Sequence, residues 1–223
     1  MSVHETIRQL PSISAVRDRC RAMAMLDAIL SPEWEFRYYS FNSKWSATEE
    51  LASMRDGGGA EYSIVFSPAG AFARGFDHES PMNPYRAGPS ALWPGLLDSM
   101  PVTFQSSAQE PAFQDMDSIL AATVCFWREP ADSAWACGAV EIPQGGDDGA
   151  DNLFGLLVDG RPEGYREFAE SYYEVAVDLG AVAHIFSLGP LTDEIVAALN
   201  PDLGLADLAA DIDEIDYPTS RVG

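Results

Sequence analysis

The most regular pattern of apolar positions lies near the start of the chain and predicts a long helix. Apolar residues recur there every three or four positions, which is the spacing of one helix face: Ile13, Val16, Cys20, Met23, Leu26 and Leu30. Ser12 or Ser14 can cap the first turn, and Pro32 stops the helix. We therefore expect a helix between Ser12 and Pro32.

The next segments have the patterns of strands. Residues 33–42 form an aromatic-rich run that is typical of a strand. Residues 61–66 alternate between the two faces of a strand, and the sequence Ser67-Pro68-Ala69-Gly70 then suits a tight turn before a second run at 71–76. This arrangement predicts a β-hairpin.

The residues between these two strand segments favour a short helix. Ser46 followed three residues later by Glu49 matches a capping box, in which each side chain bonds the other residue's backbone. Gly57-Gly58-Gly59 would end this helix.

Proline-rich connections follow the hairpin. Residues 77–91 form a long irregular segment, and residues 92–118 read as short helical pieces broken by prolines. A second hairpin is predicted from residues 120–128 and 134–142.

The C-terminal third of the chain is predominantly helical in pattern. Pro162 suits the first turn of a helix, residues 179–186 carry an apolar stripe, Thr192 can cap a further helix, and residues 205–215 alternate inward apolar with outward acidic positions. The fold class is therefore α+β, with antiparallel hairpins in residues 33–142 packed with flanking helices. We expect one domain over residues 1–223, with a soft boundary at 144–151 before the helical C-terminal portion.

Charge changes this picture more than any other property of the composition. The chain of 223 residues has 35 acidic and 13 basic residues, a formal net charge of −22. Residues 1–90 have a net charge of −2 and residues 91–223 a net charge of −20. Nucleic acids and anionic membranes are unsuitable partners for such a surface, whereas a basic protein is a suitable one. The alternative is that the acidic surface only keeps the protein soluble.

Three unpatterned cysteines fit a reducing cytoplasm, although a Cys125–Cys137 bridge across the second hairpin is an alternative. No apolar run is long enough to span a bilayer, since the longest extends only from Ile119 to Trp127. The chain lacks a nucleophile elbow, a phosphate-binding loop, a dinucleotide fingerprint and a zinc-protease motif. We therefore expect no cofactor and favour a non-enzymatic protein over an enzyme.

Three residues at a strand exit are the candidates for catalysis. Asp77, His78 and Glu79 open the proline-rich segment and could form a proton-transfer site or supply metal ligands, with Tyr85 or Trp93 as a wall. The alternative is that these side chains hydrogen-bond the backbone of their own loop.

Other candidates are aromatic or acidic. The aromatic run around Tyr38 could leave one face open for a ligand or partner. The last helix offers carboxylates to a basic partner: Asp207, Asp211, Asp213 and Glu214. The acidic loop with Asp147, Asp148 and Asp151 does not have the spacing of a calcium loop, so no specific metal site is expected, and these residues are candidates only for a non-specific contact with a divalent ion.

Three segments resemble a group of bacterial proteins to which no activity is assigned. These are residues 34–45, 75–82 and 199–202, and the likeness extends over most of the chain. The resemblance implies a bacterial cytoplasmic protein. In size, acidity and lack of catalytic motifs the chain is also similar in character to immunity proteins that neutralise toxins.

From these observations we expect a non-enzymatic interaction protein, of the immunity or regulatory kind, that binds a basic partner through its acidic surface. The alternative is an enzyme or small-molecule-binding protein with its site at residues 77–86.

Overall fold

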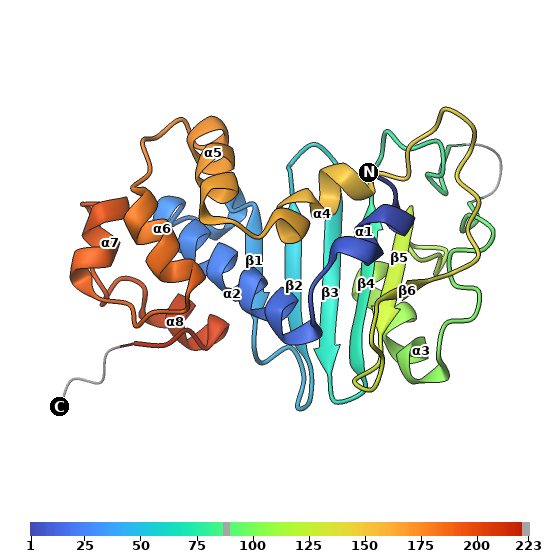
Figure 1. Ribbon diagram of the computed structural model, residues 1–223, viewed down its shortest axis with the longest axis horizontal. Helices are drawn as coiled ribbons and strands as arrows, with labels where there is room; N and C mark the ends of the chain where they lie inside the picture. Colours follow the sequence, from blue (N-terminus) through green and yellow to red (C-terminus); the bar gives the residue numbers. More distant parts are fainter. Residues whose placement is uncertain (87–89, 220–223) are drawn as a thin grey trace.

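Six antiparallel strands form a single sheet in which the spatial order follows the chain, from β1 to β6 (Figure 1). The computed structural model describes residues 1–86 and 90–219. The strands are β1 Tyr39–Asn42, β2 Glu50–Arg55, β3 Glu61–Ser67, β4 Gly70–Phe76, β5 Val124–Arg128 and β6 Ala136–Cys137. Each strand pairs with its neighbour in sequence, and β4 and β5 do so although a long segment with short helical pieces separates them.

Helices surround this sheet, and the fold is α+β as the sequence predicts. The helices are α1 Val3–Gln9, α2 Ile13–Leu30, α3 Gln105–Ala108, α4 Ala150–Asp159, α5 Pro162–Tyr172, α6 Leu179–Phe186, α7 Asp193–Leu199 and α8 Ala209–Ile215. Short 3-10 turns occupy Trp34–Phe36, Val102–Phe104 and Pro111–Phe113. Among the described residues no helix is both long enough and apolar enough to cross a membrane.

The long helix α2 organises the larger core. Ser12 caps it, with Oγ accepting the N–H of Ala15 at 3.3 Å, and its buried face includes Val16, Cys20 and Met23. In Figure 1, α1, α2 and α4 lie across one face of the sheet, and α5 to α8 gather beyond the β1 edge. The helix α2 contacts β1, α6 and α8, so it joins the sheet to this helical end.

The opposite face of the sheet has its own, smaller core. Side chains alternate along the strands, so Ile64 faces the α2 side whereas Val65 and Phe72 face the other. There they are covered by Phe104, Phe113 and neighbouring residues of the segment 92–122. This segment contains the short helical pieces that the sequence predicts.

The hairpin of β3 and β4 is confirmed. Its turn is the two residues Pro68 and Ala69, because Ser67 pairs with Gly70. Gly70 has φ +124° and lies where a Cβ would be 2.1 Å from the carbonyl oxygen of Arg128, so glycine is required there on both counts. The second hairpin is also present, but as the shorter strands β5 and β6.

The structure corrects the sequence prediction in three places. The segment 46–57 is not a helix, because Glu50–Arg55 is strand β2. Strand β1 begins only at Tyr39, and the preceding residues Trp34–Phe36 form a 3-10 turn. The first residues, which had no predicted structure, form α1.

The three cysteines are unpaired, so the alternative of a Cys125–Cys137 bridge is not observed. Cys137 lies opposite Phe126 in the sheet, whereas Cys125 lies opposite Arg74. The two thiols are thus not cross-strand neighbours.

Candidate functional site

A fully buried carboxylate lies beneath the surface where α2, β1 and α5 meet. Asp27 is 0% exposed and stands between Leu26 and Ala28 on the buried face of α2. It accepts four hydrogen bonds: from the N–H of Tyr38 at 2.9 Å, the N–H of Tyr39 at 2.6 Å, the hydroxyl of Tyr165 at 2.5 Å and the hydroxyl of Tyr173 at 2.8 Å. This carboxylate therefore holds the start of β1 and the tyrosines of the α5 region in one arrangement.

Burial dominates the electrostatics of this cluster. Removal from water raises the pKa of Asp27 to about 6, although the four hydrogen bonds oppose the rise. Burial and the nearby Asp27 carboxylate raise the pKa of Tyr165 and of Tyr173 well above the ordinary tyrosine value. The tyrosines consequently stay protonated and act as hydrogen-bond donors to Asp27.

Aromatic rings cover this cluster on the solvent side. The ring of Tyr38 meets Phe168 edge-on at 4.7 Å and Tyr172 edge-on at 4.9 Å between centroids. Phe168 and Tyr172 stack on each other at 5.5 Å. Tyr38, which the sequence suggested as a ligand-binding residue, is mostly enclosed by these rings, and burial raises its pKa to about 12.

Three aromatic side chains at this surface are open to solvent, and we call them the aromatic patch: Trp34, Phe36 and Tyr172. Their exposed fractions are 54%, 59% and 42%. Phe36, Tyr172 and Arg55 line a hollow of about 410 Å³. Arg55 also links Trp34 to this hollow, because its guanidinium lies 3.9 Å from the Trp34 ring centroid and donates to the Trp34 carbonyl.

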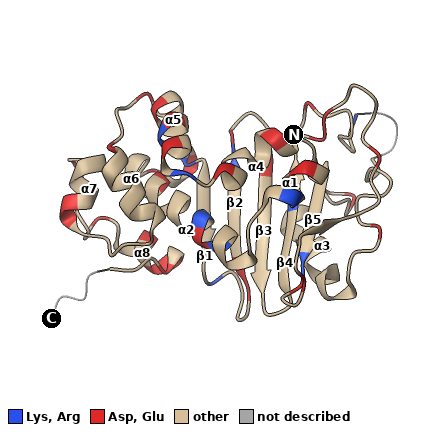
Figure 2. Cartoon of the chain, in the orientation of Figure 1, with Lys and Arg blue, Asp and Glu red and all other residues tan. Residues whose placement is uncertain are grey.

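The surface beside the aromatic patch is strongly acidic. Residues 160–219, which include α5 to α8, contain thirteen acidic and two basic residues, a net charge of −11. Figure 2 shows acidic residues on α5, α7 and α8 at this end of the molecule. Glu35 lines the hollow itself.

Three of these thirteen carboxylates bind bases from the first fifth of the chain. Asp216 forms an ion pair with Arg21 at 3.5 Å, and Asp213 forms one with Lys44 at 2.7 Å. Asp211 accepts hydrogen bonds from Arg37 through both of its carboxylate oxygens. These ion pairs attach α8 to α2 and to the two ends of β1.

The partner-binding candidates on the last helix thus have different surroundings. The Asp211–Arg37 pair is nearly buried, and Asp213 is exposed beside Lys44. Asp207 accepts the N–H of Gly204 at 2.9 Å. Glu214 is exposed, and its pKa is raised by partial burial and by the neighbouring Asp211.

The candidate catalytic residues bond mainly within their own loop. Asp77 accepts the N–H of Glu79 at 2.9 Å, and His78 lies 3.1 Å from the Glu79 carboxylate, with both side chains substantially exposed. Asn83 and Arg86 donate to the carbonyls of His78 and Glu79. These contacts favour the alternative in which the side chains order the loop.

The suggested walls of that site lie in different places. Tyr85 packs on Phe76 at 5.7 Å and is 40% exposed. Trp93 lines a separate hollow of about 570 Å³ with Glu141 and Ile142, and its indole N–H donates to the Glu141 carbonyl. The described residues therefore do not bring Trp93 and His78 to one hollow, and a catalytic role for residues 77–86 stays a prediction.

The three aspartates of the acidic loop point to different partners. Asp147 accepts the N–H of Gly149, the buried Asp148 accepts those of Val3 and Ala150, and Asp151 faces the N-terminal amine at 3.6 Å. Within residues 1–86 and 90–219 no group of three or more His, Cys, Asp or Glu residues is placed to hold a metal ion.

Sequence reasoning missed Asp27, although a signal was present. The run from Met23 to Leu30 contains one charged residue among apolar ones. A lone carboxylate on the apolar face of a helix has to be satisfied inside the protein.

No family model, no curated protein and no solved structure matches this chain.

Proposed function

We propose that this protein is a non-enzymatic interaction protein, of the immunity or regulatory kind, that binds a basic partner protein at the aromatic patch. The observation that carries the proposal is the position of Trp34, Phe36 and Tyr172, which are exposed beside a helical end with a net charge of −11. The proposal includes action in the cytoplasm, which the three unpaired cysteines support.

Exposed aromatic side chains that are already ordered favour protein recognition. Trp and Tyr bury a large area on binding and lose few degrees of freedom, so they are frequent among the residues that dominate binding energy. Tyr172 stacks on Phe168, and Arg55 lies over Trp34, so both exposed rings are held in place before a partner arrives. This preorganisation reduces the entropic cost of binding.

The charge of the surrounding surface specifies the kind of partner. Ten of the thirteen carboxylates in residues 160–219 make no ion pair within the described residues. Such a field accelerates encounter with a positively charged protein and opposes nucleic acids and anionic membranes. The partner would therefore present an apolar anchor to the aromatic patch and basic residues to its acidic surroundings.

The test uses a partner captured on the immobilised protein from a lysate of the source organism, identified by mass spectrometry and then purified. Its affinity is titrated over a range of salt concentrations for the wild type and for Trp34→Ala. Val102→Ala is the matched control, since Val102 is 80% exposed in the 3-10 turn before α3 and does not line the hollow at the aromatic patch. Thermal unfolding confirms that each variant is folded.

We expect the Trp34→Ala variant to bind the partner about tenfold to thirtyfold more weakly, which corresponds to about 1.4–2 kcal/mol for an anchor residue. The Val102→Ala variant should bind as the wild type does, and rising salt should weaken binding. An affinity that is indifferent to salt, or a partner that binds the Trp34→Ala variant normally, would contradict the proposal.

A further inference from the structure

The largest cavity described lies away from the aromatic patch, where four separate segments meet. It has a volume of about 690 Å³. Its walls come from residues 12–17 at the start of α2, residues 43–50 between β1 and β2, residues 66–70 at the β3–β4 turn, and Arg128 with Pro130 after β5. We call it the α2 pocket.

Hydroxyl groups and two arginines line the α2 pocket. The hydroxyl-bearing residues are Ser12, Ser14, Ser43, Ser46, Thr48 and Ser67. The arginines are Arg17 and Arg128. Apolar surface from Ile13, Phe66 and Pro68 completes the wall. The pocket thus combines several hydrogen-bond donors with room for an apolar group.

The guanidinium of Arg128 is bound only to backbone oxygens. It donates to the Asp132 carbonyl at 2.9 and 3.1 Å and to the Pro11 carbonyl at 3.3 Å. No carboxylate within residues 1–86 and 90–219 forms an ion pair with it. Carbonyl oxygens are neutral, so the charge of this guanidinium in the cavity wall can attract an anion.

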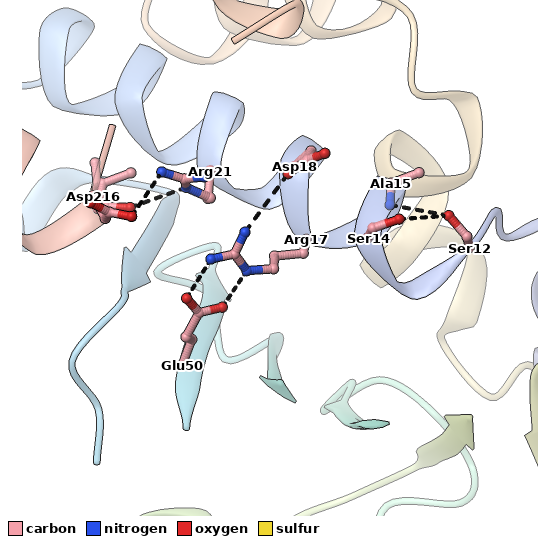
Figure 3. Close-up of polar contacts among 9 residues, drawn as sticks. Ser12, Ser14, Ala15, Arg17, Asp18, Arg21, Glu50 and Asp216 are labelled. Atoms are coloured by element: carbon pink, nitrogen blue, oxygen red, sulfur yellow. Dashed lines mark hydrogen bonds and ion pairs between the residues drawn. The ribbon is translucent and has the colours of Figure 1, made fainter. Parts of the chain in front are cut away.

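Arg17 is the second cation, and its charge is at present neutralised. Its guanidinium donates hydrogen bonds to both carboxylate oxygens of Glu50 (Figure 3). The Asp18 carboxylate lies farther away, at 3.9 Å. Glu49, the other acidic residue in the wall, accepts a hydrogen bond from the Ser46 hydroxyl at 3.2 Å. An anion that entered the pocket would compete with Glu50 for Arg17.

The start of α2 adds to this environment without determining it. The first turn of this helix contains no acidic residue, and the N–H groups of Ile13 and Ser14 make no hydrogen bond among the described residues. The hydroxyls of Ser12 and Ser14 lie 3.0 Å apart and hydrogen-bond each other (Figure 3). The backbone N–H groups and the serine hydroxyls at this helix start can donate hydrogen bonds to an oxyanion.

We propose that the α2 pocket binds a small organic molecule that carries an oxyanion, a phosphate or a carboxylate, on an apolar body. The oxyanion binds Arg128 and the hydroxyls at the start of α2, and the apolar body lies against Ile13, Phe66 and Pro68. This site is independent of the aromatic patch, because the two share no lining residue.

Three probes test the proposal by calorimetry and by NMR shifts: phenyl phosphate, benzoate and inorganic phosphate. We expect phenyl phosphate or benzoate to bind with a dissociation constant of about 1 mM or below. Inorganic phosphate should bind more weakly, because it has no apolar body. The comparison of phenyl phosphate with benzoate distinguishes a phosphate ligand from a carboxylate ligand.

Two variants with opposite expected effects locate the site. Arg128→Gln should weaken binding of the tighter probe about tenfold, because one charge-assisted contact is lost. Glu50→Gln should strengthen it several-fold, because Arg17 becomes available to the anion. Arg161→Gln is the matched control, since Arg161 is exposed on the surface at the start of α5. This variant should bind the probe as the wild type does.

The Glu50→Gln arm also covers the case in which Arg128→Gln fails to fold, since a gain of affinity cannot come from unfolding. Absence of saturable binding by all three probes would overturn the proposal. Binding that Glu50→Gln leaves unchanged or weakens, or that inorganic phosphate matches in strength, would overturn it as well.

Discussion

Replacement of Asp27 tests whether one buried carboxylate holds the aromatic patch in place. Asp27→Ala removes the acceptor of four donors, two of which are the backbone N–H groups of Tyr38 and Tyr39. Tyr38 N–H keeps a second acceptor, the hydroxyl of Tyr173 at 3.3 Å, whereas Tyr39 N–H has no other acceptor among the described residues. A buried donor without an acceptor costs roughly 1–3 kcal/mol, so we expect a loss of about 4 kcal/mol in the free energy of unfolding.

Asp27→Asn is the matched control for shape. Its amide oxygen can accept from the two backbone N–H groups, and its NH₂ group can donate to the Tyr165 hydroxyl, which rotates to accept. The variant also removes a carboxylate that is costly to bury in its charged form. We therefore expect Asp27→Asn to be within about 1 kcal/mol of the wild type at neutral pH, far from the Asp27→Ala value.

The pH dependence follows from the raised pKa of Asp27. Its value of about 6 in the folded chain exceeds the ordinary 3.8, so the protonated form favours the folded state. That contribution is complete below pH 3.8 and is lost as the pH rises to about 6; the whole loss corresponds to about 3 kcal/mol. Between about pH 5 and pH 7.5, the wild type should lose about 1.4 kcal/mol relative to Asp27→Asn, which does not titrate.

The assay is urea unfolding followed by tryptophan fluorescence, with all comparisons made as differences from Asp27→Asn at the same pH. Taking differences removes the contributions of the other carboxylates. The pH stays at about 5 or above because so acidic a chain loses net charge and solubility in stronger acid. A difference that is flat with pH, or that grows in favour of the wild type as the pH rises, would refute the raised pKa. An Asp27→Ala variant as stable as Asp27→Asn would refute the role of the hydrogen bonds.

Two further pairs of substitutions test the packing and the ion pairs by the same unfolding assay. A Cβ at Gly138 would lie 1.9 Å from the Gly95 carbonyl oxygen, so Gly138→Ala should cost about 2 kcal/mol or more, whereas Gly155→Ala, in open space on α4, should stabilise by about 0.5–1 kcal/mol. Equal effects would mean that the backbones do not approach so closely. Arg37→Ala should lower the free energy of unfolding by about 3–5 kcal/mol, because it leaves the partly buried carboxylate of Asp211 without its ion-pair partner. Lys44→Ala should lower it by less than about 0.5 kcal/mol, because Lys44 and Asp213 are both exposed. A costly Lys44→Ala would contradict that ranking.

The helices were the most predictable part of the fold, because the signals that define them are local. Ser12 caps α2, and Thr192 caps α7 through a hydrogen bond from the Ile195 N–H, as their sequence positions indicate. Pro162 lies in the first turn of α5 as expected. These helices need only residues within about one turn to specify their ends.

The prediction of a helix after Ser46 was wrong for a physical reason. The Ser46 and Glu49 side chains do interact, and the Ser46 N–H bonds the Glu49 carbonyl at 3.1 Å, but these bonds close the turn between β1 and β2. The residues that follow pair with β1 on one side and β3 on the other. That pairing is decided by distant strands, so a local motif could not reveal it.

The candidate sites were predictable only in part. The exposed aromatics belong to a run that the sequence had indicated, whereas Tyr172 joins them from α5, more than a hundred residues later. The α2 pocket was invisible in the sequence because its walls come from four separate segments. Hydroxyls and arginines spaced along a chain have no distinctive pattern until the fold brings them together.

The uneven charge of the chain also has a structural use that its sequence did not suggest. The acidic α8 is attached to the rest of the molecule by the bases Arg21, Arg37 and Lys44, so part of the negative C-terminal charge is neutralised within the fold. Removal of Asp211 would leave the buried Arg37 without its carboxylate and so would disturb folding as well as any binding. Carboxylates that make no ion pair within the part of the chain that the structure describes, such as Glu167 on α5, can be neutralised without that consequence. At these positions an effect on partner affinity reports the electrostatics alone.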